Sequence, residues 1–483
     1  MTSRAAMLRA VGEVRSSFGP FVLVVLAAAF AGTVWPAPID FGYQPAARAL
    51  ILYAVIGSTA LAVALSLAGR DMLWVALLGP FVIQYYQVAL GWEVTLGSTS
   101  PLRVAPVLGV LALLAVELAK RPIRLSRAEA AVTMLWELAC LIWLVEGLAA
   151  TGTAVPLVTW LLNAAVPPLC YFLARDRLAT ADGAAVVGLS VLGGFLILIV
   201  ASIGISFVAL DYRGSASLLA ARNANDGNIV LGYLMLAWPI AVLTARTIHG
   251  ALVPALGLSF VAGAVLLFSR GGLLVVPLLT IGTLVVLAGR PLKTLVSLVA
   301  IGAAALGLWV ALGDSLGLLE AWTARLNFTQ LQLTDLWAVL ATVQDQLTSS
   351  GRSEIWDLAR SLFRTSPLTG AGFNSFEAAG PGYSEAHSLF YQTLGQRGLL
   401  GVAFLYGFLG WWLWTLLRPV VGRGEVRERL VRLGGVLSWL VFTHAVGSGL
   451  VVTTGGGLMV NVAGAMLLMI ALQPAGANRS GAA

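Results

Sequence analysis

A histidine at the end of a long polar segment is the best candidate for acid–base chemistry in this sequence. His387 stands where that segment returns to an apolar run, and a neutral imidazole can accept a proton from a hydroxyl group. Glu385, two residues earlier, is placed to orient the imidazole or to act as the base itself. The pattern predicts a general base here, with a structural hydrogen bond at a membrane interface as the alternative.

Arg270 is the best candidate for binding an anion. It lies in the tetrapeptide Ser-Arg-Gly-Gly at 269–272, at the end of an apolar run, where the glycines permit close approach of a ligand or a neighbouring helix. A guanidinium grips phosphate through two parallel donors and stays charged in a poorly hydrated place. A side chain that extends to lipid headgroups is the alternative.

Other arginines gather in two further places. Arg213 and Arg222 lie in the connection 211–227, which we expect to be a solvated loop. Arg352, Arg360 and Arg364 follow the polar side of a predicted amphipathic helix, and the last two are one turn apart. An anionic ligand would offset the repulsion between them, although such faces are more often simply hydrated.

The motifs of soluble enzymes are absent from the sequence. Three scattered histidines do not make a histidine metal site, and there is no Asp-x-Asp pair, no phosphate-binding Gly-x-x-x-x-Gly-Lys loop and no Gly-x-Ser-x-Gly nucleophile motif. Cys140 and Cys170 both lie in apolar runs. We therefore expect no metal, no other cofactor and no disulfide framework.

The composition shows what must position these residues. Of the 483 residues 59% are hydrophobic and 11% are charged, too few charges to cover soluble domains of this size. The apolar runs do not alternate as barrel strands do, so the sequence predicts an all-α, polytopic integral membrane protein. Fourteen runs are long enough to be candidate spans: 20–35, 47–69, 72–91, 102–119, 130–150, 155–174, 183–210, 228–245, 251–268, 273–289, 294–312, 388–417, 433–450 and 455–473.

The basic residues predict the orientation. With the N-terminus in the cytoplasm, 19 of the 29 Lys and Arg fall on the cytoplasmic side and 10 outside, as expected for cytoplasmic loops. Both termini are then cytoplasmic. The net charge of +7 belongs to this topology, so we expect membrane lipid, and not nucleic acid, around the protein.

The segment 313–387 is the one long stretch without a predicted span, and it falls outside the cytoplasm. It separates an N-terminal transmembrane bundle at 1–312 from C-terminal transmembrane helices at 388–483. An apolar stripe predicts an amphipathic helix that ends at Ser366-Pro367, followed by a glycine-rich turn at 370–376. The stripe consists of Ile355, Leu358, Ala359, Leu362 and Phe363.

Three blocks together resemble bacterial O-antigen ligases and the related O-antigen and exopolysaccharide polymerases. They are SRGG at 269–272, GRSEIWDLARSLFRTSPLTGAGFNSF at 351–376 and AHSLFYQTLGQRGLLG at 386–401. The resemblance covers roughly residues 205–415. It implies about 12–14 transmembrane helices in the bacterial inner membrane, a periplasmic active site, and metal-independent transfer of a glycan, with inversion, from undecaprenyl pyrophosphate to an acceptor hydroxyl.

The resemblance also implies roles for particular residues. His387 matches the family's loop histidine, the proposed base, and Arg270 matches the arginine that contacts the pyrophosphate. Arg213 and Arg222 both qualify as the family's second essential arginine. Arg352, Arg360, Arg364 and Glu385 are candidate supporting residues.

Three functions remain open. An O-antigen ligase, whose acceptor is a lipid A-core sugar, is the leading hypothesis, and a polymerase that extends a growing glycan uses the same donor. A transporter or flippase of lipid-linked sugars would need polar sites near the membrane midplane. Glu137 and Glu146 are candidates, but nine residues place them on opposite sides of one helix.

Overall fold

Helices are the only regular secondary structure in the described part of the chain. The structure is a computed structural model that describes residues 63–69, 72, 111–120, 125–178, 180–210, 216–266, 270–288, 292–293, 296, 352–379, 386, 388–417 and 423–446. Its principal helices are α5 (Arg127–Thr151), α6 (Val155–Leu178), α7 (Ala181–Leu210), α8 (Ala216–Ile248), α9 (Leu252–Leu266), α10 (Arg270–Leu287), α14 (Arg352–Thr365), α15 (Ser375–Ala379), α16 (Leu389–Leu417) and α17 (Arg423–Val441), and a π-helix, η1 (Phe442–Val446), follows α17. Within these residues the predicted all-α class is confirmed.

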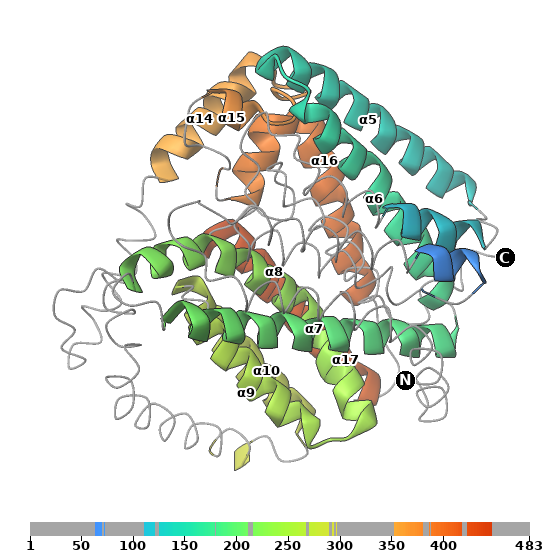
Figure 1. Cartoon of the computed structure of the whole chain (residues 1–483), viewed down its shortest axis with the longest axis vertical. Coiled ribbons are helices and arrows are strands. Elements are labelled where there is room, and N and C mark those ends of the chain that lie inside the picture. Colours follow the sequence, from blue (N-terminus) through green and yellow to red (C-terminus); the bar gives the residue numbers. More distant parts are fainter. Residues whose placement is uncertain are drawn as a thin grey trace.

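The helices form two groups (Figure 1). In one group α7 to α10 pack against one another, with α17 lying against α8 and α10. In the other, α5 pairs with α6 and carries α15 and α16, while α14 packs on α16. The first group is centred on Phe195, Trp238 and Phe260, whose rings lie 5.1–5.8 Å apart.

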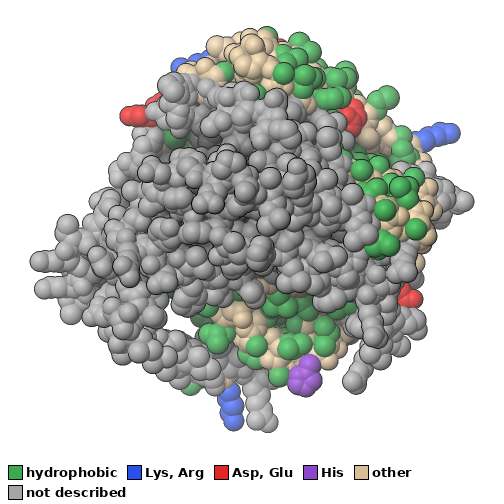
Figure 2. All heavy atoms as spheres, viewed as in Figure 1, with side chains coloured by type: hydrophobic (Ala, Val, Ile, Leu, Met, Phe, Trp, Pro, Cys, Tyr) green, Lys and Arg blue, Asp and Glu red, His purple; other side chains and the backbone are tan. Residues whose placement is uncertain are grey.

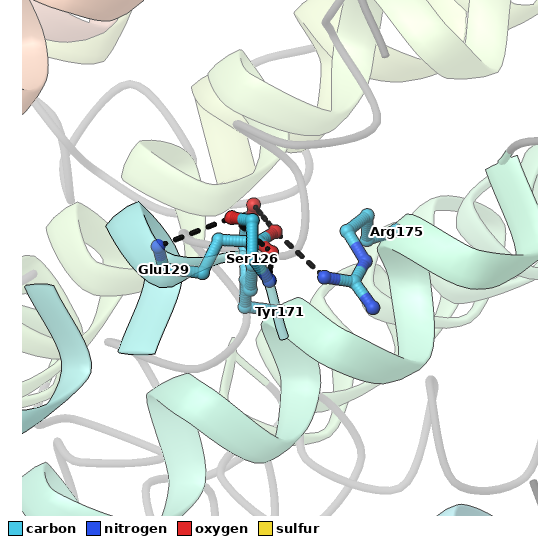
Figure 3. A network of polar contacts seen from close by, with 4 residues as sticks. All are labelled: Ser126, Glu129, Tyr171 and Arg175. Carbon is cyan, nitrogen blue, oxygen red and sulfur yellow. Dashed lines mark hydrogen bonds and ion pairs between the residues drawn. The ribbon is translucent and has the colours of Figure 1, made fainter. Parts of the chain in front are cut away.

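Local sequence signals fix both ends of α5. Ser126 caps the first turn through a reciprocal pair of bonds with Glu129, and Gly152 ends the helix in the left-handed conformation. Glu129 also accepts hydrogen bonds from Tyr171 (2.9 Å) and Arg175 (2.6 Å) of α6 (Figure 3). This network ties the start of α5 to the end of α6, so the two helices run antiparallel.

The outer side of α5 is apolar and exposed. Among the described residues α5 is the one helix long and apolar enough to cross a membrane by these two criteria, and there are four shorter apolar helices at Asp182–Leu196, Leu234–Ile248, Leu252–Val265 and Gly271–Leu287. Figure 2 shows apolar side chains along the edge where α5 lies. Its exposed large apolar side chains are Val132, Met134, Leu135, Leu138, Leu141 and Val145. The larger number of spans stays a prediction, since several of the runs lie outside the described residues.

The amphipathic helix of the polar segment forms where the sequence predicts it. Helix α14 ends at Thr365, directly before Ser366-Pro367. Ile355 and Ala359 are buried with Phe376 and Ala386, and Leu358 and Leu362 pack against them. The predicted helix and its apolar face are therefore confirmed, and its apolar stripe packs inside the protein.

Two segments differ from the expectation. Residues 216–227, expected to be a solvated loop, are the first turns of α8, because the chain continues in helical conformation into the apolar run that follows. The run 388–417, expected to be one span, is broken at Gly398, where φ is 60° and ψ is −158°.

Candidate active site

The break at Gly398 divides α16 into a short arm, 389–397, and a long arm, 399–417. Phe390 and Tyr406 are 16 positions apart, which corresponds to about 24 Å along a straight helix. Their ring centroids are only 6.2 Å apart, so the arms fold towards each other. The short arm is too short to cross a membrane. It begins just after His387 and folds back against the long arm.

Residues 366–374, here called the docking loop, satisfy the backbone groups that this break frees. The amides of Ala371 and Gly372 donate to the carbonyls of Gly395 (3.0 Å) and Gln396 (2.9 Å). In return the amides of Leu399 and Leu400 donate to Pro367 (2.9 Å) and Leu368 (3.0 Å), in place of the partners they would have in a continuous helix. The loop thereby replaces one missing turn of α16.

Glycines allow the backbones to approach this closely. Gly370, Gly372 and Gly398 all have positive φ values, of 73°, 84° and 60°. A Cβ on Gly370 would lie 2.4 Å from the amide nitrogen of Arg397, and one on Gly372 would lie 2.1 Å from that of Gly147 in α5. The Gly-rich turn predicted from the sequence is thus a three-way contact between the docking loop, α16 and α5.

The end of the docking loop anchors to α5 and α6. The amide of Phe373 donates to the carbonyl of Trp143 in α5 (3.0 Å), and Thr159 of α6 donates to the side chain of Asn374 (2.8 Å). Asn374 itself adopts a positive φ of 62°. The loop that begins at α14 therefore ends against two helices distant from it in sequence.

A buried arginine lies at the centre of this contact. Arg397 is 3% exposed, and its guanidinium donates to Asn163 of α6 (3.0 Å). The same group lies over the rings of Trp143 (5.1 Å) and Phe373 (5.4 Å). Arg397 is one of the ten basic residues that the predicted topology places outside the cytoplasm, and its position ten residues into an apolar run was a sign of a buried role.

The residues on either side of His387 are buried and held. The indole of Trp356, in α14, donates to the carbonyl of Ala386 (3.0 Å), and the amide of Ala386 donates to the side chain of Gln392 (2.5 Å). Ser388 is 3% exposed and accepts from the amide of Gln392 (2.9 Å). Sequence reasoning missed Gln392 and Trp356.

The predicted site residues are only partly covered by the described residues. Arg270 is the first residue of α10, Arg222 lies in the second turn of α8 and Arg352 begins α14. His387, Glu385 and Arg213 lie outside the described residues. The structure therefore describes the residues on either side of the predicted base in the sequence, while the meeting of Arg270 with His387 stays a prediction.

The two described loop arginines are exposed. Arg360 pairs with Asp357 of the same helix (3.2 Å) and lies over the ring of Tyr391 in the short arm (5.9 Å). Arg364 is exposed near the end of α14. Arg360 thus lies over the helix that begins just after His387.

Comparison with known proteins gives a match to one protein family, over part of the chain. Residues 255–406 match the family model described as O-antigen ligase. No curated protein and no solved structure matches the chain. The matched range includes Arg270, α14, the docking loop, His387 and the short arm, whereas Arg213 and Arg222 precede it. The resemblance seen in the sequence is thereby confirmed for residues 255–406, which are similar to the O-antigen ligase family.

Proposed function

We propose that this protein is an O-antigen ligase that transfers a glycan from undecaprenyl pyrophosphate to a sugar hydroxyl of lipid A-core. Members of the family are O-antigen ligases and polymerases, with glycosyltransferase-like activity. The observation that carries the proposal is the family match at 255–406, which includes all three sequence blocks. The packing of the last two blocks on each other, through the docking loop and the broken helix α16, supports it.

The proposed reaction is a direct displacement at the anomeric carbon. His387 takes the proton of the acceptor hydroxyl while its oxygen forms the new glycosidic bond, and the bond from the anomeric carbon to the pyrophosphate oxygen breaks. One displacement inverts the configuration. Undecaprenyl pyrophosphate departs with the bonding electron pair, and the developing negative charge needs cations nearby.

In the proposal, arginines supply the positive charge that balances the departing pyrophosphate, so no metal is required. Arg270 begins α10, where the backbone amides of the first turn are unbonded within the helix and the helix dipole is positive. The side chain and the helix end therefore favour an anion together. We propose Arg213 or Arg222 as a second pyrophosphate ligand, and Arg352, Arg360, Arg364 and Glu385 as supporting residues.

We further propose that the reaction takes place on the periplasmic side of a polytopic inner-membrane protein with both termini in the cytoplasm. The family is one of inner-membrane proteins. Along α5, Glu129 in the polar network and Gly147 under the docking loop are 18 residues apart, or about 27 Å. This is close to the thickness of a bilayer's hydrocarbon core, about 30 Å, and the exposed face between them is apolar.

A polymerase is the second candidate, because the same family contains enzymes that use the same kind of donor to extend a glycan. Purified protein is incubated with undecaprenyl-pyrophosphate glycan, with and without lipid A-core, in the presence of a chelator. Ligation predicts a product only with lipid A-core. A ladder of lengthening glycans without lipid A-core would establish the polymerase, and transport of donor across a bilayer without any covalent product would overturn both.

The residues are tested in the same assay. His387→Ala and Arg270→Ala should each abolish transfer, while both proteins remain folded and inserted in the membrane. Full transfer by either variant would remove that residue from the mechanism.

A further inference from the structure

The backbone of Ala386, the residue before His387, is fixed from two sides. The carbonyl of Ala386 accepts the indole N–H of Trp356 from α14, and the amide of Ala386 donates to the side chain of Gln392 in the short arm. Ala386 is fully buried. Both backbone polar groups of this residue are therefore satisfied by side chains, from two helices that the sequence separates.

The contact with Ala386 is the one hydrogen bond that the side chain of Gln392 makes among the described residues. Its side chain is fully buried, and its oxygen must be the atom facing Ala386, because a backbone amide can only donate. Its own amide nitrogen, Nε2, has no hydrogen-bond partner among the described residues. Burying a glutamine that makes one hydrogen bond, while its two N–H donors have no partner among the described residues, lowers the stability of the fold. Stability therefore does not explain why a glutamine is placed here.

Trp356 makes the second contact with a rigid ring. The indole stacks on Tyr391 of the short arm, with centroids 4.8 Å apart and planes 18° apart. Stacking fixes the ring plane and so aims the N–H at Ala386. Tyr391 and Gln392 are adjacent residues. The stacking of Trp356 on Tyr391 therefore joins the two groups that hold the backbone of Ala386.

We propose that Gln392 and Trp356 are positioning residues that set the place of His387 in the transfer reaction. The inference rests on the proposed function, in which His387 is the base. A base must lie within hydrogen-bond reach of the hydroxyl it deprotonates, and errors of about 1 Å can cost about 100-fold in rate. Ala386 is held by both hydrogen bonds and Ser388 is buried, so the residues before and after His387 both have fixed places.

The test uses two pairs of variants in the purified full-length protein. Gln392→Met removes the acceptor with little change of volume, and Gln396→Met makes the same change at an equally buried glutamine one turn further along. Gln392→Glu keeps an acceptor oxygen at the same reach. Trp356→Phe keeps a ring to stack on Tyr391 but removes the N–H donor, and it tests the second contact without altering Gln392.

We expect Gln392→Met to lower kcat by about 10- to 100-fold with little change in KM for the lipid-linked donor, because binding of the donor is separate from placement of the base. Trp356→Phe should lower kcat by a smaller factor, and Gln392→Glu should recover most of the loss. Gln396→Met should match Gln392→Met in melting temperature but keep its kcat.

Two results would overturn the inference. One is equal kcat in Gln392→Met and Gln396→Met, and the other is a loss in Gln392→Met that appears wholly as a lower melting temperature, with full kcat in Trp356→Phe. The inference is separable from the proposed function. If His387→Ala keeps its activity the proposed function fails, whereas an inactive His387→Ala beside a fully active Gln392→Met overturns the inference alone.

Discussion

Replacing Gly147 with alanine tests whether the docking loop is held to α5 by direct backbone contact. Gly147 lies inside α5, and a Cβ at this position would be 2.5 Å from the carbonyl oxygen of Phe373 and 2.8 Å from its amide nitrogen. Ordinary contacts of a Cβ atom begin at 3.4 Å. The loop must therefore retreat by about 0.9 Å, in a place where neither backbone can rotate away.

Two opposing effects set the magnitude. Alanine is a better helix former than glycine by about 1 kcal/mol, which on its own would stabilise α5. Overpacking of a close contact costs about 1–3 kcal/mol, and weakening the bond from the amide of Phe373 to Trp143 adds about 0.5–1.5 kcal/mol. We expect Gly147→Ala to destabilise the protein by about 1–3 kcal/mol and to release the docking loop.

Gly232 supplies a matched control. It is also a buried glycine inside a helix, but a Cβ there would meet no atom of the described residues within 4 Å. Thermal unfolding in detergent compares the two variants, and chymotrypsin reports on the loop, because Phe373 is fully buried while the loop is docked. Gly147→Ala should unfold at a lower temperature and be cut at Phe373, whereas Gly232→Ala should not. Equal stability and equal resistance at Phe373 would refute the close-contact account.

Three further substitutions separate structural from functional roles. Asn163→Leu removes the acceptor of a hydrogen bond from the buried guanidinium of Arg397, a bond worth about 1.5–3 kcal/mol. The melting temperature in detergent should fall, and an unchanged value would contradict the role of this bond in holding Arg397. Ser126→Ala removes the cap of α5 and should cost about 1 kcal/mol in thermal unfolding with transfer unaffected. A large loss of transfer would show that the capped end of α5 matters for catalysis. Arg360→Ala breaks an exposed ion pair with Asp357, so the melting temperature should stay the same. If the KM for the donor is also unchanged, Arg360 is not a supporting residue of the site.

The sequence predicted the elements whose signals are local. Helix α14 has a continuous apolar stripe and a Ser-Pro end, and both were sufficient to place it. The glycines at 370 and 372 indicated a turn because few other residues adopt positive φ. The family resemblance rested partly on the same residues, which lie in the block 351–376.

The long-range contacts could not be predicted. A glycine in an apolar run does not show that the helix breaks there, because the break at Gly398 is stable only when the docking loop supplies the missing hydrogen bonds. Asn163 is a polar residue within the apolar run 155–174, and its partner Arg397 is 234 positions away in sequence. The burial of Gln392 against Ala386 likewise depends on how α14 packs on the short arm.

The most direct test of the central claim is glycan transfer by the purified protein in detergent, with undecaprenyl-pyrophosphate glycan as donor, lipid A-core as acceptor and a chelator present. His387→Ala is assayed beside the unaltered protein. The account predicts a ligated product that requires both the acceptor and His387 and forms without metal. Ligated product of equal yield from His387→Ala, or covalent transfer that stops when metal is chelated, would contradict it.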